Sequence, residues 1–144
     1  MDFLPIFVNI RKQPCLVVGG GEVAARKVSL LLKAGAVVTV VSPELSHELV
    51  DMLQAGAITH TPRDFADDDI KQPVLVIAAT DNQQVNQHVS VLARARGIPV
   101  NVVDSPDLCS CIMPSIVDRS PVQIAISTGG ASPVLARMIR TRLE

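Results

Sequence analysis

The chain has 144 residues, of which 48% are hydrophobic, and its net charge at pH 7 is −1. This length suffices for one ordinary domain, or for one domain plus an appended element. The balanced charge and the absence of Trp and Tyr argue against nucleic-acid binding and against an anionic membrane surface. With no secretory signal, no apolar run near the roughly 20 residues that span a bilayer, and an odd number of cysteines, we expect a cytoplasmic protein.

Short runs of Val, Leu and Ile alternate with helical patterns up to about residue 112. The apolar runs predict strands at 15–18, 37–41, 74–79 and 99–103, and a short further strand is predicted at 58–60. Between them, helices are predicted over 22–34, over 42–54 with Ser42 as N-cap and Pro43 at N1, and from Thr80 to Gly97 with Gln83 completing a capping box. The triplet Asp67-Asp68-Asp69 is interpreted as a solvated helix start.

This alternation predicts an α/β fold, a Rossmann-type doubly wound parallel sheet, over residues 1–112. Residues 113–144 have a different pattern: strands at 113–117 and 122–127, then a helix from Ser132-Pro133. A hairpin and one helix are too small for a core of their own. We therefore expect them to pack on the first domain or on another subunit. The helical pattern continues to Glu144, so we expect this element to be truncated.

The most informative local feature is the turn Gly19-x-Gly21-x-x-Ala24 between the first strand and the first helix. In dinucleotide-binding domains the first glycine permits the tight turn, the second admits the pyrophosphate, and the small third residue lets helix and strand pack closely. This context predicts a dinucleotide site. The alternative is a glycine-rich turn without a ligand.

The acidic residue expected about 20 residues further on is replaced by Ser42. Glu44 is the nearest carboxylate, and it is either a ribose partner or only a first-turn helix acid. No Arg or Lys lies nearby to accept a 2′-phosphate. The sequence therefore favours NAD over NADP.

Ligands of such sheets bind beyond the carboxyl ends of the strands. The stretches there include Thr80-Asp81 and Asn101 to Asp104. Asp104 is the candidate general base that takes a proton as hydride leaves a substrate. The alternative is a turn-forming Asp before Ser105-Pro106.

Two further motifs have less specific interpretations. The loop from Ser127 through Thr128 and Gly129 to Gly130 precedes a helix, and it is either a second anion site or a simple connection. Cys109-x-Cys111 lacks a second pair of ligands, so no metal site is predicted.

Several motifs together resemble the N-terminal module of the siroheme synthase family, which combines precorrin-2 dehydrogenase and sirohydrochlorin ferrochelatase. The similarity covers essentially the whole chain. The matching motifs are LPIF at 4–7, VVGGGEVAARK at 17–27, AATDN at 78–82, NVVD at 101–104, IMPSIVDRSP at 112–121 and STGGASPVLAR at 127–137.

The resemblance implies NAD-dependent oxidation of precorrin-2 to sirohydrochlorin, followed by insertion of ferrous iron to give siroheme. It implies that Asp104 is the shared catalytic residue and that the later segment forms a homodimer. The tetrapyrrole carboxylates would be bound near Asn101 and by Ser127, Thr128 and Gly129. The resemblance also implies NAD contacts at Glu22, Val23, Pro43 and Glu44, to which the glycine turn adds Gly19 and Gly21, and the strand ends add Thr80 and Asp81.

Two other hypotheses compete with this enzyme. A nucleotide-sensing regulatory domain also uses a glycine turn in a parallel sheet, but it needs neither Asp104 nor a substrate cleft. A nucleotide-dependent methyltransferase fits the sheet but not the segment 113–137.

Overall fold

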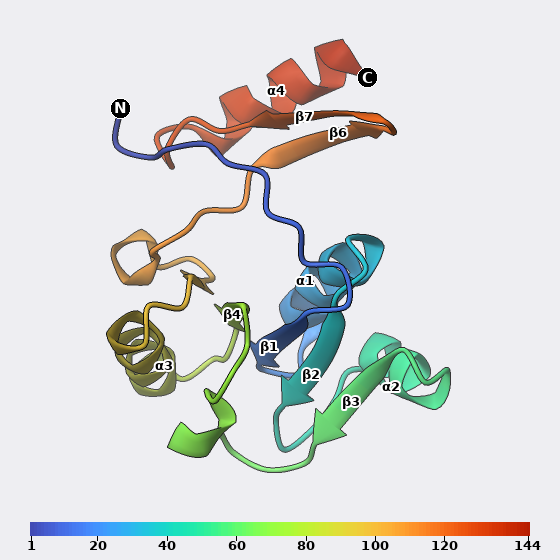
Figure 1. The fold of residues 1–144 in the computed structure, drawn as a ribbon, viewed down its shortest axis with the longest axis vertical. Coiled ribbons are helices and arrows are strands. Elements are labelled where there is room, and N and C mark those ends of the chain that lie inside the picture. The colour runs from blue at the N-terminus through green and yellow to red at the C-terminus, as the bar shows by residue number, and fades with distance from the viewer. The chain divides into compact units, whose positions relative to one another are not determined.

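The computed structural model describes residues 1–144, which divide into two compact units. The larger unit is Phe7–Ser110, and the smaller one combines Met1–Ile6 with Cys111–Glu144. Figure 1 shows the helices and strands of both units. The first six residues thus belong with the C-terminal segment, which the sequence did not indicate.

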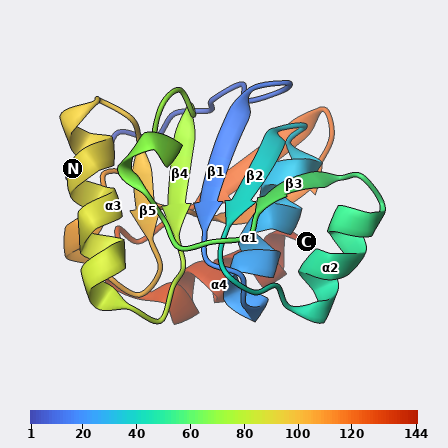
Figure 2. The ribbon, with the colours of Figure 1, turned by 90° about the horizontal axis from the view of Figure 1, so that it is seen from below.

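The larger unit contains a five-stranded parallel sheet in the order β3-β2-β1-β4-β5 (Figure 2). The strands are β1 (Pro14–Val18), β2 (Val37–Val41), β3 (Ile58–Thr61), β4 (Leu75–Ala78) and β5 (Val100–Val102). The helices are α1 (Glu22–Lys33), α2 (His47–Gln54) and α3 (Gln83–Ala95), with short 3₁₀ turns at Asp67–Asp69 and Pro106–Leu108. The chain moves outward from β1 in both directions, so right-handed crossovers place α1 and α2 on one face and α3 on the other.

The core of this unit is formed by the central strands of the sheet, which coincide with predicted apolar runs. Val17 of β1 is fully buried and pairs with Val40 of β2 and Ile77 of β4, which are also fully buried. Such continuous β-branched strands, covered on both faces, are typical of a doubly wound sheet. The predicted fold class is therefore confirmed.

The start of α2 was predicted wrongly. The helix begins at His47, and its N-cap is Ser46, not Ser42. Ser42 instead donates its hydroxyl to the carbonyl oxygen of Glu44, which makes residues 42–46 a turn rather than a first helical turn. This turn is tied to the glycine turn, because the amide of Ser46 donates to the carbonyl oxygen of Gly20 at 2.7 Å.

The start of α3 also differs from the prediction. Asn82, not Thr80, is the N-cap, and its Oδ1 accepts from the amides of Gln84 and Val85 at 3.0 and 3.2 Å. The Thr80 hydroxyl is not available as a cap, because it donates to Oδ1 of Asn86 at 2.6 Å.

The triplet of aspartates opens a 3₁₀ turn, and its last member is engaged rather than solvated. Asp69 forms an ion pair with Arg63 at 2.6 Å and accepts from the amide of Ala66 at 2.8 Å. These partners hold the pKa of the Asp69 carboxyl below its ordinary value, the hydrogen bond from Arg63 being the main cause. The contacts among Arg63, Ala66 and Asp69 thus stabilise the loop between β3 and β4.

The smaller unit is the predicted hairpin followed by a helix. Strands β6 (Ser115–Arg119) and β7 (Val122–Ile126) pair antiparallel, and α4 (Pro133–Leu143) packs on both, with Ser132 as its N-cap. The first strand lies two residues later than predicted. Only two apolar side chains of this unit are buried, Val117 and Ala136. No helix in either unit is both long enough and apolar enough to span a membrane.

Candidate functional site

The turn between β1 and α1 consists of three glycines with different surroundings. Gly19 has φ +126°, and a side chain there would collide with the carbonyl oxygen of Ala79. A side chain on Gly20 would collide with the carbonyl oxygen of Glu44. A Cβ on Gly21 would meet nothing within 4 Å. The turn is therefore tightly packed on its inner side and open at Gly21, which is the geometry that lets a pyrophosphate approach the backbone.

Helix α1 begins next to this opening without a side-chain cap. Its N-cap residue is Gly21, which forms no side-chain hydrogen bond. Side chains cap the three other α-helices. The first amides of a helix have no partner within the helix and carry partial positive charge. The first turn of α1 therefore offers donors to an anion, which fits the diphosphate of a dinucleotide.

A cavity of about 940 Å³ is lined by the residues that follow β1, β2, β4 and β5. Its size lies in the range of cofactor sites. The structure brings nine of the residues predicted for the site together around this cavity: Gly19, Gly21, Glu22, Val23, Pro43, Glu44, Thr80, Asp81 and Asp104.

The charge of the cavity wall is one-sided. Five carboxylate side chains line it, and no Lys or Arg does. They are Glu22, Glu44, Asp64, Asp81 and Asp104. A wall of this sign disfavours any negatively charged ligand group that the N-terminus of α1 does not neutralise.

Asp104 is the second residue after β5 and is exposed at the cavity. Its backbone is left-handed, with φ +59°. Outside glycine this conformation is uncommon, and Asp is one of the residues that tolerate it best. The preceding residue is fixed to the sheet, because the amide of Val103 donates to the carbonyl oxygen of Ala78 at 3.0 Å.

Four residues predicted for the site do not line this cavity. Asn101 is buried within β5, and its Nδ2 lies 3.7 Å from Sγ of Cys109. Ser127, Thr128 and Gly129 belong to the smaller unit.

The loop after β7 uses much of its hydrogen-bonding capacity internally. The amide of Gly129 donates to Ser127 Oγ at 3.0 Å, and that of Ser132 donates to Thr128 Oγ1 at 2.8 Å. The amide of Ala131 donates to the carbonyl oxygen of Thr128 at 3.2 Å. Hydrogen bonds within the loop thus use three of the backbone amides that the sequence suggested as donors to an anion.

Sequence reasoning missed one wall of the cavity. Phe65, Val85 and His88 line it, and His88 forms a 2.7 Å contact with Asp67 and an edge-to-face contact with Phe65 at 6.1 Å between ring centroids. Phe65 lies in the loop after β3, which has no periodic pattern. The one available signal was the placement of Val85 and His88 on one face of α3.

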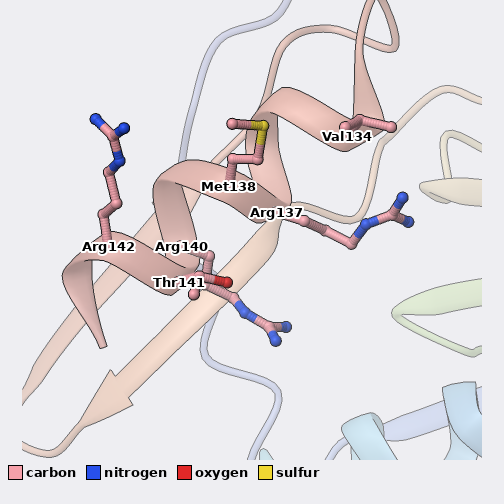
Figure 3. A pocket seen from close by; sticks show the side chains of 6 residues that line it. All are labelled: Val134, Arg137, Met138, Arg140, Thr141 and Arg142. Atoms are coloured by element: carbon pink, nitrogen blue, oxygen red, sulfur yellow. The ribbon is translucent and has the colours of Figure 1, made fainter.

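A second hollow, of about 500 Å³, lies along α4 in the smaller unit. Arg137, Arg140 and Arg142 line it together with Val134, Met138 and Thr141 (Figure 3). The guanidinium group of Arg142 points away from those of Arg137 and Arg140. The three cations therefore do not converge on one ligand group.

The cysteines and the possible metal ligands add no further site. Burial raises the pKa of the Cys15 thiol to about 11, so this side chain is not a reactive thiolate at neutral pH. Nowhere do three side chains of His, Cys, Asp or Glu come together as metal ligands.

The comparisons with known proteins agree with this geometry. Residues 6–115 match the family described as "Putative NAD(P)-binding", and residues 119–144 match the family "Sirohaem biosynthesis protein central". A solved structure described as "SirC, precorrin-2 dehydrogenase" is 29% identical, with a TM-score of 0.83, over 98% of this chain and 69% of that one. The predicted dinucleotide cofactor is thus confirmed as NAD(P).

Curated relatives that match the whole chain are siroheme synthases. The one from Thioalkalivibrio sulfidiphilus is 60% identical over 144 residues, and the one from Methylobacillus flagellatus is 61% identical over the same length. Both matches cover 100% of this chain but only 29% and 31% of the relatives, so the chain spans about three tenths of their length. The resemblance seen in the sequence motifs is therefore confirmed. The chain belongs to the NAD(P)-binding family that matches residues 6–115, and over its whole length it is similar to the N-terminal part of siroheme synthases.

Proposed function

We propose that this chain catalyses the NAD-dependent oxidation of precorrin-2 to sirohydrochlorin. The observation that carries the proposal is the cavity at the strand ends, where the open glycine turn, the uncapped start of α1 and the carboxylate of Asp104 line one space. The similarity to a solved precorrin-2 dehydrogenase supports the same substrate.

The dinucleotide would be held by residues already placed around the cavity. Gly19, Gly21 and the first turn of α1, with Glu22 and Val23, would bind the diphosphate. Pro43 and Glu44 would contact the adenosine ribose. Thr80 and Asp81 would contact the part of the dinucleotide that lies beyond the carboxyl end of β4. The acidic wall and the absence of a lining Lys or Arg favour NAD over NADP, because a 2′-phosphate would add negative charge beside Glu44.

Asp104 is the proposed catalytic residue. Oxidation removes two hydrogens from the substrate, one as hydride and one as a proton. The bound nicotinamide ring supplies the hydride acceptor. The exposed carboxylate of Asp104 accepts the proton, so that two electrons and two hydrogen nuclei leave the tetrapyrrole in one step.

The second proposed activity is insertion of ferrous iron into sirohydrochlorin to give siroheme. Iron is a substrate of this step, and the four ring nitrogens of the tetrapyrrole supply its ligands. Two pyrrole protons must leave when the metal enters, and Asp104 would accept them in the same cavity. Because the relatives are siroheme synthases, this order of steps fits their name.

We further propose that residues 113–144, which belong to the smaller unit, form a homodimer. Apolar side chains in this segment are widely exposed, and burying them against a second copy would remove that surface from water. They are Val122, Ile124, Val134, Leu135, Met138, Ile139 and Leu143. The substrate carboxylates would be bound by Ser127, Thr128 and Gly129, with Asn101 supporting the strand before Asp104.

One experiment tests the dehydrogenase. The chain is mixed with precorrin-2 and NAD, and the NADH absorbance is followed, with NADP in a parallel sample. We expect NADH to form with NAD, and NADPH to form much more slowly with NADP. A folded chain that binds NAD but neither forms NADH nor binds the tetrapyrrole in an optical titration would instead be a nucleotide sensor.

A further inference from the structure

The backbone of Asp104 has a conformation that its neighbours must maintain. Its φ of +59° is left-handed, and the residue is exposed, so it has no packing of its own to hold it. Strained backbone of this kind persists only where the surrounding structure fixes it. The residues that fix the loop from 103 to 108 therefore also set where the carboxylate points.

The Cys109 thiol closes this loop on one side. Its Sγ lies 3.1 Å from the amide nitrogen of Val102, 3.2 Å from the carbonyl oxygen of Val102 and 3.4 Å from the carbonyl oxygen of Ser105. The sulfur accepts from the amide and donates its S–H to one of the carbonyls. One side chain thus joins the end of β5 to the residue after Asp104.

The Gln83 side chain holds the loop on the other side. Its Nε2 donates to the hydroxyl of Ser105 at 3.1 Å. Its Oε1 accepts from Nδ2 of Asn86 at 3.0 Å. The orientation of the Gln83 amide is therefore fixed at both ends, by a donor contact and by an acceptor contact.

Asn86 connects the Gln83 contacts to the cofactor side of the cavity. It is buried, its Nδ2 also donates to the carbonyl oxygen of Thr80 at 3.0 Å, and its Oδ1 accepts from the Thr80 hydroxyl at 2.6 Å. A continuous series of hydrogen bonds thus runs from Thr80, which lines the cavity, through Asn86 and Gln83 to Ser105.

We infer that Gln83 and Cys109 are positioning residues for Asp104, and that Asn86 couples the position of Asp104 to the turn after β4. We call the contacts of Gln83 and Cys109 with the loop from 103 to 108 the clamp. The expected change in kcat rests on the proposed function, whereas the clamp contacts lie within the larger unit and do not depend on it.

The kinetic test compares Gln83→Ala with Gln87→Ala, which removes an exposed glutamine from the same helix that forms none of these bonds. Moving a catalytic group by up to about 1 Å from its productive position costs about ten- to a hundredfold in rate. We expect kcat to fall by this factor in Gln83→Ala, with KM for NAD unchanged within about twofold, and Gln87→Ala to match the wild type. A Gln83→Ala variant with the kcat of the wild type would overturn the inference, as would a loss of NAD affinity equal to the loss of kcat.

Cys109→Ser and Cys109→Ala provide a second comparison. Serine keeps a donor and an acceptor at this position, whereas alanine keeps neither. We expect Cys109→Ser to recover most of the kcat that Cys109→Ala loses. Equal kcat values in the two variants would show that the thiol contacts do not position Asp104.

A readout without turnover separates the inference from the proposed function. In ¹⁵N-labelled chain, the amide resonances of Asp104 and Ser105 should shift in Gln83→Ala, that of Thr80 should shift with them, and all three should stay in place in Gln87→Ala. If the wild type fails to oxidise precorrin-2, the proposed function fails, and these shifts alone decide the clamp. Unmoved Asp104 and Ser105 amides would refute it.

Discussion

The carbonyl oxygen of Gly20 accepts a hydrogen bond of 2.7 Å from the backbone amide of Ser46. This bond joins the glycine turn, which faces the proposed diphosphate, to the turn after β2, which faces the proposed ribose. The contact is close enough that a Cβ on Gly20 would collide with the carbonyl oxygen of Glu44. The glycine turn and the turn after β2 can therefore lie this close together only because Gly20 has no side chain.

The first prediction follows from this contact. Gly20→Ala should destabilise the fold by about 1–3 kcal/mol, because a methyl group forced against backbone is overpacking, and it should weaken NAD binding about tenfold or more as the ribose turn moves. Urea unfolding and calorimetric titration with NAD measure the two effects.

Gly21→Ala is the matched control for this prediction. Its Cβ would meet open space, and its φ of −87° suits any residue. It should therefore unfold like the wild type and yet bind NAD more weakly, since the methyl group faces the cavity. Normal stability in Gly20→Ala would contradict the packing argument.

The sequence was sufficient to predict the sheet, because most of its strands are short runs rich in Val, Leu and Ile, with the edge strand β3 (ITHT) as the exception. It was insufficient for the helix starts. Ser42 and Thr80 both have good capping chemistry, but their hydroxyls bond to Glu44 and to Asn86, and only the folded chain brings Asn86 beneath Thr80. Phe65 reached the cavity by tertiary packing of an aperiodic loop, so no local pattern marked it.

A second prediction concerns Asp104. Asp104→Asn should abolish turnover with NAD affinity nearly unchanged, because the amide cannot accept the proton. Asp104→Gly should also be inactive but more stable than the wild type, by about 1 kcal/mol, because glycine adopts left-handed backbone without a Cβ clash. Asp107→Asn, an exposed change in the same loop outside the cavity wall, is the control for turnover. Appreciable NADH formation by Asp104→Asn would remove Asp104 from the mechanism.

The ion pair between Arg63 and Asp69 predicts an acid-labile contribution to stability. The native pKa of Asp69 is below its ordinary value of 3.8, so the unfolded chain binds this proton more readily. The contribution is complete above pH 3.8 and is lost as the pH falls below that value through the native pKa. Arg63→Met should therefore lower the free energy of unfolding at pH 7 and flatten its decline in acid.

Urea unfolding at several pH values measures this effect. Arg96→Met is the control, because Arg96 is exposed at the end of α3 and forms no ion pair. The same acid decline in Arg63→Met as in the wild type would mean that the pair does not stabilise the loop.

The proposed homodimer can be tested with two valines of equal exposure. Val134 in the smaller unit and Val91 in the larger unit are each 57% exposed. Val134→Glu should shift the chain from dimer to monomer in sedimentation equilibrium, because an unpaired carboxylate is costly to bury in an apolar interface. Val91→Glu should leave the dimer intact. Dissociation by both variants, or by neither, would argue against an interface at α4.

The preference for NAD depends on the charge at the mouth of the cavity. Glu44 lies in the turn after β2 and lines the cavity, whose wall contains no Lys or Arg. Glu44→Lys replaces a group that repels a 2′-phosphate with one that attracts it, so the ratio of NADP to NAD affinity should rise by about tenfold or more. Glu48→Lys makes the same charge change in the first turn of α2, outside the cavity wall, and should leave the ratio almost unchanged. Dissociation constants for both cofactors decide the point, and an unchanged ratio in Glu44→Lys would mean that the ribose lies elsewhere.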